Sequence, residues 1–322
     1  MQTRLTRLLE IEHPVMLAGM GGVSYHRLVA AVSAAGGFGC LGASTMSTDA
    51  MVEEIAAVRA LTDKPFGVDL LTAMPGDMVA QVEKIIEGGA AVFVAGLGVP
   101  VEVVELCHRH GVLVVNMCGK VDHARRAVDA GCDIVVAQGT EAGGHTGQVA
   151  TMPLVPQVVD AVGDRVPVVA AGGIVDGRGL AAALALGADG VWVGTRFIAT
   201  PEARSVAGYK EALLRTAEDG TTISRAYSGK TMRVVRNAYT AYFDEHPAEL
   251  ERFPAQLGKS INDKAFHLGG DADTPEVDPE RECYPTGQGV GAIAALVPAA
   301  ELVHRFVAEA EQALERARAV TA

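Results

Sequence analysis

The chain has 322 residues, of which 49% are hydrophobic, 20% are charged and 5% are aromatic. This composition is ordinary for a globular enzyme and too apolar for a disordered chain. Acidic residues outnumber basic ones by 39 to 27, which gives a formal charge of −12. A phosphate backbone repels such a chain, so nucleic-acid binding is not expected as its main role.

The five cysteines are scattered without a Cys-x-x-Cys pair, which argues against a disulfide framework and a structural zinc site. No His, Asp and Glu cluster has metal-ligand spacing either. Residues 1–7 lack the features of a signal peptide, and the uncharged run from Leu28 to Thr48 is interrupted by glycines. We therefore expect a reduced, cytoplasmic protein with no metal and no membrane partner. Whether it is a monomer or a homodimer is left open.

Short β-rich apolar runs recur along the first 200 residues, and a helical stretch follows each of them. The predicted strands are residues 15–20, 38–43, 66–71, 91–97, 113–118, 133–138, 166–171 and 190–197. Helical spacing is found in segments such as 25–35, 49–61, 77–87 and 121–130. Glycine, the residue best suited to the left-handed turn after a helix, follows such stretches at Gly36, Gly88, Gly111, Gly131 and Gly187.

These strands are continuous apolar runs without strict alternation, which is typical of a parallel sheet covered on both faces. Eight strand–helix units in succession predict an α/β fold, a (β/α)8 TIM barrel. A doubly wound open sheet is the alternative, but it usually has fewer strands and a G-x-G-x-x-G fingerprint after the first one. Residues 19–22, Gly-Met-Gly-Gly, do not have that spacing.

The regular alternation of predicted strands and helices ends at about residue 200. Residues 203–217 have a helical pattern, residues 233–243 are mixed, and residues 246–279 are polar and contain four prolines. Residues 299–319 have helical spacing again and predict the last barrel helix. We predict a barrel of residues 1–200 and 285–322 with an inserted helical cap of residues 201–284; an ordinary helical appendage is the alternative.

The loop after the sixth predicted strand is the most unusual one. Residues 138–147, Gln-Gly-Thr-Glu-Ala-Gly-Gly-His-Thr-Gly, contain four glycines, which let the backbone approach a flat ligand closely. Active sites of such barrels lie among the loops that follow the strands. His145 on this loop is therefore a candidate general acid or base.

Two further glycine-containing loops follow the seventh and eighth predicted strands. Gly172 and Gly173 end the seventh unit, and Gly194 and Thr195 lie at the end of the eighth. In barrels of this type, these two loops commonly form a phosphate site in which backbone amides face the anion. The pair of loops predicts a phosphorylated ligand, although Gly172 and Gly173 alone would also suit a tight turn.

The segment 138–147 resembles the signature of FMN-dependent nitronate monooxygenases, formerly called 2-nitropropane dioxygenases. Residues 14–20, 66–69, 171–174, 194–197 and 287–291 resemble other parts of that family in the same order. The resemblance covers nearly the whole chain. It is less specific for the reaction, because flavin-dependent enoyl-thioester reductases and related enzymes acting on acyl-CoA share the signature.

The resemblance implies a barrel that holds FMN without a covalent bond and uses His145 as its catalytic histidine. Ala18 and Met20 would line the flavin ring, and Gln138, Gly143 and Gly144 would contact it. The phosphate end would be surrounded by Gly172, Gly173, Trp192, Val193, Gly194 and Thr195.

Two polar residues are also assigned to the cofactor, Lys120 after the fifth predicted strand and Asp69 within the third. Lys120 would place a positive charge against the flavin ring, where it would stabilise an anionic reduced form. Asp69 would contact the ring or cap a loop. The chain departs from the family here, since relatives commonly have Asn at Asp69, Ser or Thr at Lys120 and often Pro at Gly19.

Three functional hypotheses follow from the sequence. The first is FMN-dependent oxidation of alkyl nitronates with O2 to a carbonyl compound and nitrite, in which His145 deprotonates a nitroalkane or helps to hold the nitronate. The second is a flavin-dependent reductase or dehydrogenase that acts on an acyl thioester with NAD(P)H. The third is a flavin-binding barrel without turnover. All three predict a small-molecule partner.

Overall fold

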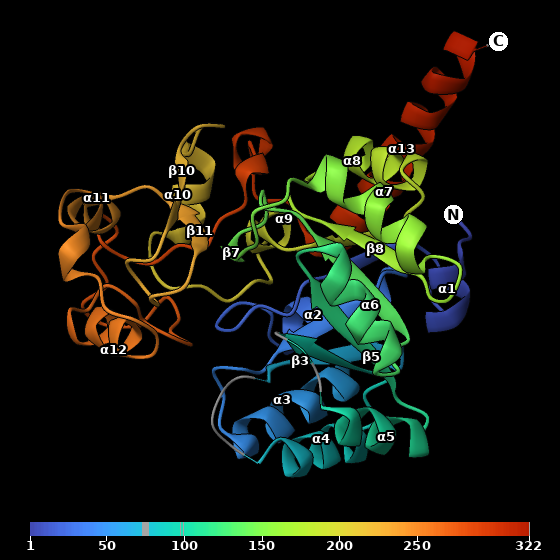
Figure 1. The fold of residues 1–322 in the computed structure, drawn as a ribbon, viewed down its shortest axis with the longest axis horizontal. Coiled ribbons are helices and arrows are strands. Elements are labelled where there is room, and N and C mark those ends of the chain that lie inside the picture. Colours follow the sequence, from blue (N-terminus) through green and yellow to red (C-terminus); the bar gives the residue numbers. More distant parts are fainter. Residues whose placement is uncertain (73–76, 97, 99, 322) are drawn as a thin grey trace.

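The computed structural model describes residues 1–72, 77–96, 98 and 100–321, and its main element is a ring of eight parallel strands (Figure 1). The strand order is β1-β9-β8-β6-β5-β4-β3-β2, and a parallel bridge between Met16 and Phe38 joins the two outer strands. The Leu17 amide donates to the Phe38 carbonyl at 2.8 Å, and the Phe38 amide donates to the Val15 carbonyl at 2.9 Å. The prediction of a (β/α)8 barrel is confirmed.

The barrel elements lie close to their predicted positions. The strands are β1 (Val15–Leu17), β2 (Gly39–Gly42), β3 (Phe66–Leu71), β4 (Val92–Gly96), β5 (Leu113–Cys118), β6 (Ile134–Gln138), β8 (Val168–Ala171) and β9 (Gly190–Val193). The surrounding helices are α2 (His26–Ala34), α3 (Thr48–Leu61), α4 (Met78–Glu87), α5 (Val101–Arg109), α6 (Val121–Asp129), α7 (Thr151–Val162), α8 (Gly177–Ala185), the short α9 (Thr195–Ile198) and α13 (Ala299–Thr321).

Three predicted boundaries are corrected by the structure. The first strand ends at Leu17 and not at residue 20, and the eighth ends at Val193 because Gly194 turns the chain into α9. After α4 the left-handed residue is Gly89, with φ +75°, whereas Gly88 is right-handed. Leu97, at the end of the fourth predicted strand, lies outside the described residues.

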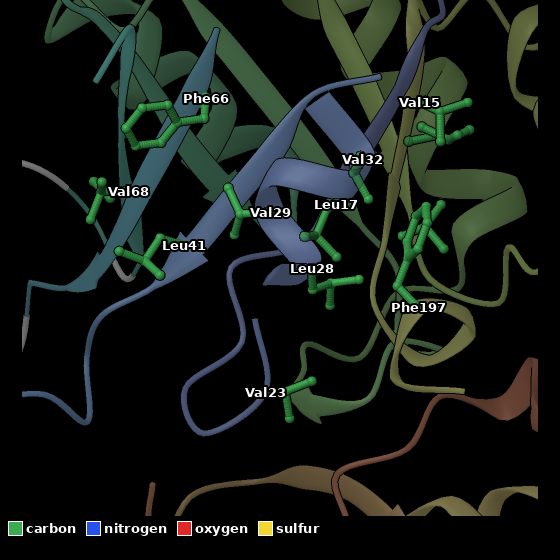
Figure 2. Packing of buried hydrophobic residues seen from close by; sticks show 14 of the residues in the cluster. Val15, Leu17, Val23, Leu28, Val29, Val32, Leu41, Phe66, Val68 and Phe197 are labelled. Atoms are coloured by element: carbon green, nitrogen blue, oxygen red, sulfur yellow. The ribbon is translucent and has the colours of Figure 1, made fainter. Parts of the chain in front are cut away.

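Side-chain alternation along the strands builds two apolar layers. On β1, Val15 and Leu17 point outward and pack with Val29 and Val32 of α2 (Figure 2). Met16 belongs instead to a cluster inside the barrel that includes Phe38 and Trp192. Because both faces of each strand are buried, continuous apolar runs are needed, and this is the pattern that the sequence has.

One end of the barrel is covered by helix α1 (Arg4–Leu9). Leu5, Leu9 and the following Ile11 are buried in the same cluster as the inward-facing strand residues. Arg4 fixes this helix, since its Nε and one terminal nitrogen donate to the two Asp189 carboxylate oxygens at 3.1 and 2.7 Å. The carboxyl ends of the strands lie at the other end of the barrel.

A lobe with its own apolar core follows α9 in the chain and lies beside the barrel (Figure 1). Its elements are α10 (Tyr209–Arg215), β10 (Thr221–Ser224), β11 (Met232–Val235), α11 (Ala238–Glu245) and α12 (Ala255–Asn262). The helix predicted over 203–217 is therefore shorter, because Gly208 takes a left-handed conformation immediately before it. The chain then returns to the barrel through α13, which matches the predicted closing helix. Within the described residues, no helix is long and apolar enough to cross a bilayer.

Candidate active site

A cavity of about 1740 Å³ opens at the carboxyl ends of the barrel strands. Its wall is formed by loops after most of the strands and by lobe segments within residues 225–232, 253–270 and 282–289. The barrel thus supplies one side of the cavity and the lobe supplies another. Such a position is where active sites of (β/α)8 barrels are found.

Most of the site residues singled out in the sequence line this one cavity. They are Ala18, Met20, Asp69, Gln138, Gly143, Gly144, His145, Gly172, Gly173, Trp192, Gly194 and Thr195. Two others are not among the lining residues in the described part of the chain. Lys120 is exposed immediately before α6, and Val193 is buried in β9.

The loop after β8 presents backbone groups to the cavity. Gly172 and Gly173 have φ angles of +105° and +73°, a region that side chains with a Cβ rarely adopt. Thr151 Oγ1 lies 3.0 Å from the Gly172 carbonyl oxygen, so the start of α7 packs directly against the turn. The amides of Gly172 and Gly173 form no hydrogen bond to any residue that the structure describes. They are therefore available to a ligand oxygen.

Three loops meet at Gly143. A Cβ placed on Gly143 would lie 2.7 Å from the Gly287 amide nitrogen, so only glycine permits this contact. The Gly287 amide donates to Thr195 Oγ1 at 2.9 Å, and the Gln288 amide donates to the Glu141 carbonyl at 2.8 Å. The loops after β6 and β9 are thus joined to the segment that precedes the last helix.

Glu141 anchors the glycine-rich loop. Its carboxylate accepts hydrogen bonds from the Thr151 amide and from Thr151 Oγ1, both at 2.8 Å. This places a negative charge at the N-terminus of α7, where the helix dipole favours it. The sequence analysis did not predict this role for Glu141. The signal that could have shown it is a glutamate in the middle of a glycine-rich loop shortly before a helix.

His145 is held between the barrel and the lobe. Together with Gly144 it forms the short strand β7 (Gly144–His145), which pairs in an antiparallel manner with β11 of the lobe. Gln138 Nε2 donates to the His145 carbonyl at 2.8 Å. The His145 ring lies in the cavity wall, and its Nε2 is 3.1 Å from Ser228 Oγ.

Ser228 also contacts the backbone of Lys230. Its Oγ lies 3.2 Å from the Lys230 carbonyl oxygen and 3.3 Å from the Lys230 amide nitrogen, which donates to it. The hydroxyl has one hydrogen, so it accepts from Nε2 of His145 when it donates to that carbonyl, and it donates to Nε2 when it does not. Ser228 therefore holds the imidazole in place with either tautomer of the ring.

Burial lowers the pKa of His145 below the ordinary value of 6.5, and the positive charge of Lys230 lowers it further. Both effects disfavour the imidazolium. At neutral pH the ring is therefore an unprotonated base, which is the form that can remove a proton from a substrate.

Asp69 lies in the cavity wall at the centre of the barrel. Burial raises its pKa from 3.8 to about 8. It packs closely on Gly19, where a Cβ would lie 2.2 Å from Asp69 Cβ. Within the described residues its carboxyl group has no ion-pair or hydrogen-bond partner. Asp69 is thus a carboxyl group that is mainly neutral at pH 7.

Ser228 was missed by the sequence reasoning. It is buried in the lobe and lies 83 residues after His145 in the chain. Nothing in the residues around it marks it, because its role depends on the pairing of β11 with β7. Among the described residues, no group of three or more His, Cys, Asp or Glu side chains is arranged to hold a metal ion.

The model of the nitronate monooxygenase family matches residues 2–78 and 71–309 of the chain. The chain belongs to this family. As a member of the nitronate monooxygenase family, the protein is an oxidoreductase, and the family match covers both the barrel and the lobe.

Curated relatives of this family member have more than one activity in their names. A protein from Mycobacterium tuberculosis named "(3aS,4S,5R,7aS)-5-hydroxy-7a-methyl-1-oxo-octahydro-1H-indene-4-carboxyl-CoA dehydrogenase" is 43% identical over 237 residues, which are 73% of this chain and 66% of the relative. The chain therefore spans just under two thirds of that relative's length. A "Probable nitronate monooxygenase" from Staphylococcus saprophyticus is 34% identical over 320 residues, 84% of this chain and 89% of the relative.

Two solved structures are similar to this chain over almost its whole length. FabK from Thermotoga maritima is 35% identical with a TM-score of 0.89, and the match covers 99% of both chains. A nitroalkane oxidase from Streptomyces ansochromogenes is 31% identical with a TM-score of 0.86, covering 97% of this chain and 99% of the other.

Proposed function

We propose that the protein is an FMN-dependent oxidoreductase that oxidises alkyl nitronates with O2 to a carbonyl compound and nitrite. The observation that carries this proposal is His145, an uncharged base in the wall of a large cavity at the catalytic end of the barrel. Membership of the nitronate monooxygenase family supports the same reaction.

The residues of the cavity fit FMN. Consecutive positive-φ glycines present the free amides of Gly172 and Gly173, and these suit a phosphate group. Ala18 and Met20 would lie along the ring, with Gln138, Gly143 and Gly144 beside it. The phosphate end would be held by Gly172, Gly173, Trp192, Val193, Gly194 and Thr195. When bound, FMN supplies the electron-accepting chemistry.

His145 has the geometry of a general base. The unprotonated nitrogen of the neutral ring would accept the proton from the carbon that bears the nitro group, while the contact between Nε2 and Ser228 Oγ holds the ring in place. Gln138 and β11 hold the backbone of the same residue, which limits movement of the ring relative to the cavity. The residues 201–284 would act as the substrate cap, since lobe residues form part of the cavity wall.

The experiment compares two forms of one substrate. Purified holoprotein is given 2-nitropropane or its preformed nitronate, and nitrite release is measured. If His145 removes the substrate proton, His145→Ala should lower kcat/KM for the neutral nitroalkane by about 10²–10⁴-fold. Turnover of the preformed nitronate should fall much less, since that proton is already absent.

The matched control is His110→Ala, which removes an exposed histidine at the end of α5. It should leave both rates unchanged. Equal loss of both activities in His145→Ala would refute proton abstraction, and absence of nitrite from either substrate with the wild-type protein would refute the proposed reaction.

A second candidate, oxidation or reduction of an acyl thioester, is favoured by the size of the cavity. Its volume of about 1740 Å³ exceeds the roughly 300–1,000 Å³ typical of small-ligand sites, which leaves room for a bulky substrate besides a cofactor. The name of the M. tuberculosis relative points to a CoA thioester. Anaerobic loss of flavin absorbance with NAD(P)H, but not with a nitronate, would favour this candidate.

A further inference from the structure

A second histidine in the cavity wall is paired with a buried carboxylate. Nδ1 of His267 lies 2.6 Å from Glu282 Oε2, and the His267 amide donates to Glu282 Oε1 at 3.0 Å. The Glu282 side chain is 1% exposed, and that of His267 is 17% exposed. One carboxylate therefore holds the backbone and the ring of the same residue, which fixes the direction of the imidazole.

This pairing leaves one ring nitrogen for a ligand. Glu282 as a carboxylate can only accept hydrogen bonds, so the hydrogen of a neutral His267 ring lies on Nδ1. Nε2 is then an acceptor, and within the described residues it has no hydrogen-bond partner. A molecule in the cavity that carries an O–H or N–H group can donate to it.

The surroundings of His267 are mainly apolar. Phe253, Leu257, Phe266 and Leu268 belong to the same cavity wall. One further polar atom lies nearby: Thr45 Oγ1 is buried without a partner, and it would lie 3.4 Å from a Cβ on Gly269, two residues beyond His267. A largely apolar pocket with a few fixed polar groups is the usual form of a site that orients a specific ligand.

Both members of the pair belong to the lobe. The Glu282 carbonyl accepts a hydrogen bond from Asn237 Nδ2 at 2.8 Å, and the Cys283 amide donates to the Ala265 carbonyl at 2.8 Å. The segment that carries Glu282 is thus joined to the segment that carries His267, and both residues lie in the cavity wall.

We propose that the His267–Glu282 pair is a second recognition point in this cavity, where Nε2 of His267 accepts a hydrogen bond from a hydroxyl or amide group of a largely apolar substrate. This inference rests on the proposed function only in that the cavity holds the substrate. Glu282 is a positioning residue, and His267 contacts the ligand.

The test measures binding and needs no turnover. Isothermal titration calorimetry of the holoprotein at pH 9 compares 1-octanol with its isomer 1-methoxyheptane. Only the alcohol can donate a hydrogen bond. The wild-type protein should bind the alcohol about fivefold more tightly, as expected for one net hydrogen bond. His267→Phe should bind both isomers with similar affinity.

Glu282→Gln gives a readout that a merely structural role would not produce. The glutamine amide can donate to Nδ1 of His267, which moves the ring hydrogen to Nε2 and turns the acceptor into a donor. The preference for the alcohol should then fall to about one while binding of the ether strengthens. Glu280→Gln, which removes an exposed carboxylate two residues before Glu282, is the control and should keep the wild-type preference.

Two results would overturn the proposal. One is absence of measurable 1-octanol binding to the wild-type protein, and the other is an unchanged alcohol preference in both His267→Phe and Glu282→Gln. Because neither measurement involves nitrite or electron transfer, failure of the proposed nitronate oxidation would be seen separately in the turnover assay.

Discussion

Asp69→Asn should change how the stability of the protein depends on pH. Burial raises the pKa of Asp69 from 3.8 to about 8 in the folded protein. Between these two values the folded state holds a proton that the unfolded state has released. The stabilisation that comes from this proton is complete below pH 3.8, and it is lost as the pH rises through 8.

The size of the effect follows from the pKa difference. In this window the folded state binds one more proton, so the free energy of unfolding falls by about 1.4 kcal/mol per pH unit. Between pH 5 and pH 7 the loss is about 2.7 kcal/mol, taking Asp69 alone. Asparagine has nearly the same shape and stays neutral, so the variant does not carry this loss. Burying the asparagine amide changes the free energy of unfolding by the same amount at every pH, because the amide does not titrate.

Urea unfolding of the wild-type and Asp69→Asn holoproteins at pH values from 5 to 9 measures the difference directly. The stability of the variant relative to the wild type should rise by about 1.4 kcal/mol per unit up to pH 7 and level off above about pH 8. Asp63→Asn, which removes an exposed carboxyl group, is the matched control for loss of one negative charge. A relative stability of Asp69→Asn that is constant over this range would refute the reasoning.

Three further predictions concern the cavity wall, and a fourth concerns helix α12. Because burial lowers the pKa of His145, the acid limb of the kcat/KM profile for a neutral nitroalkane should lie below pH 6.5; a limb above that value would contradict the assignment. Ser228→Ala removes the hydrogen-bond partner of Nε2 and should lower kcat by about tenfold, with Ser228→Thr restoring part of it, as stopped-time nitrite assays can show. Gly143→Ala should cost about 1–3 kcal/mol in urea unfolding and weaken flavin retention, because its Cβ would meet the Gly287 backbone. Gly258→Ala in α12 meets no atom within 4 Å and should instead stabilise by about 0.5–1 kcal/mol.

The barrel could be predicted from the sequence because its signals are local. Residues 66–71 and 113–118 are mainly apolar runs with one polar residue each, since both faces of a barrel strand are buried, and the structure has strands with these same bounds. Strand ends were harder to predict. The strand predicted over 190–197 ends earlier, because the backbone turns at Gly194, where φ is −103° and ψ is −82°.

The candidate site could be predicted only in part. The glycines and His145 lie on loops that follow strands, and the barrel geometry alone brings such loops together. The short strand β7 and the role of Ser228 depend on contacts between a barrel loop and a lobe much later in the chain. The pairing of His267 with Glu282 depends on the fold of the lobe itself. No local pattern in the sequence encodes these contacts, because each joins residues that are distant in the chain.

Because β7 pairs with β11, the position of His145 depends on both the barrel and the lobe. A chain that stopped at residue 200 would lose the strand that aligns His145, and it would also lose the Gly287 and Gln288 amides that hold the loops after β9 and β6. The smallest unit that keeps the candidate site therefore includes the lobe and the segment before α13. Substitutions in residues 221–235 can change the position of the His145 imidazole without altering any of the eight barrel strands. The reaction can therefore diverge among related proteins while the barrel stays the same.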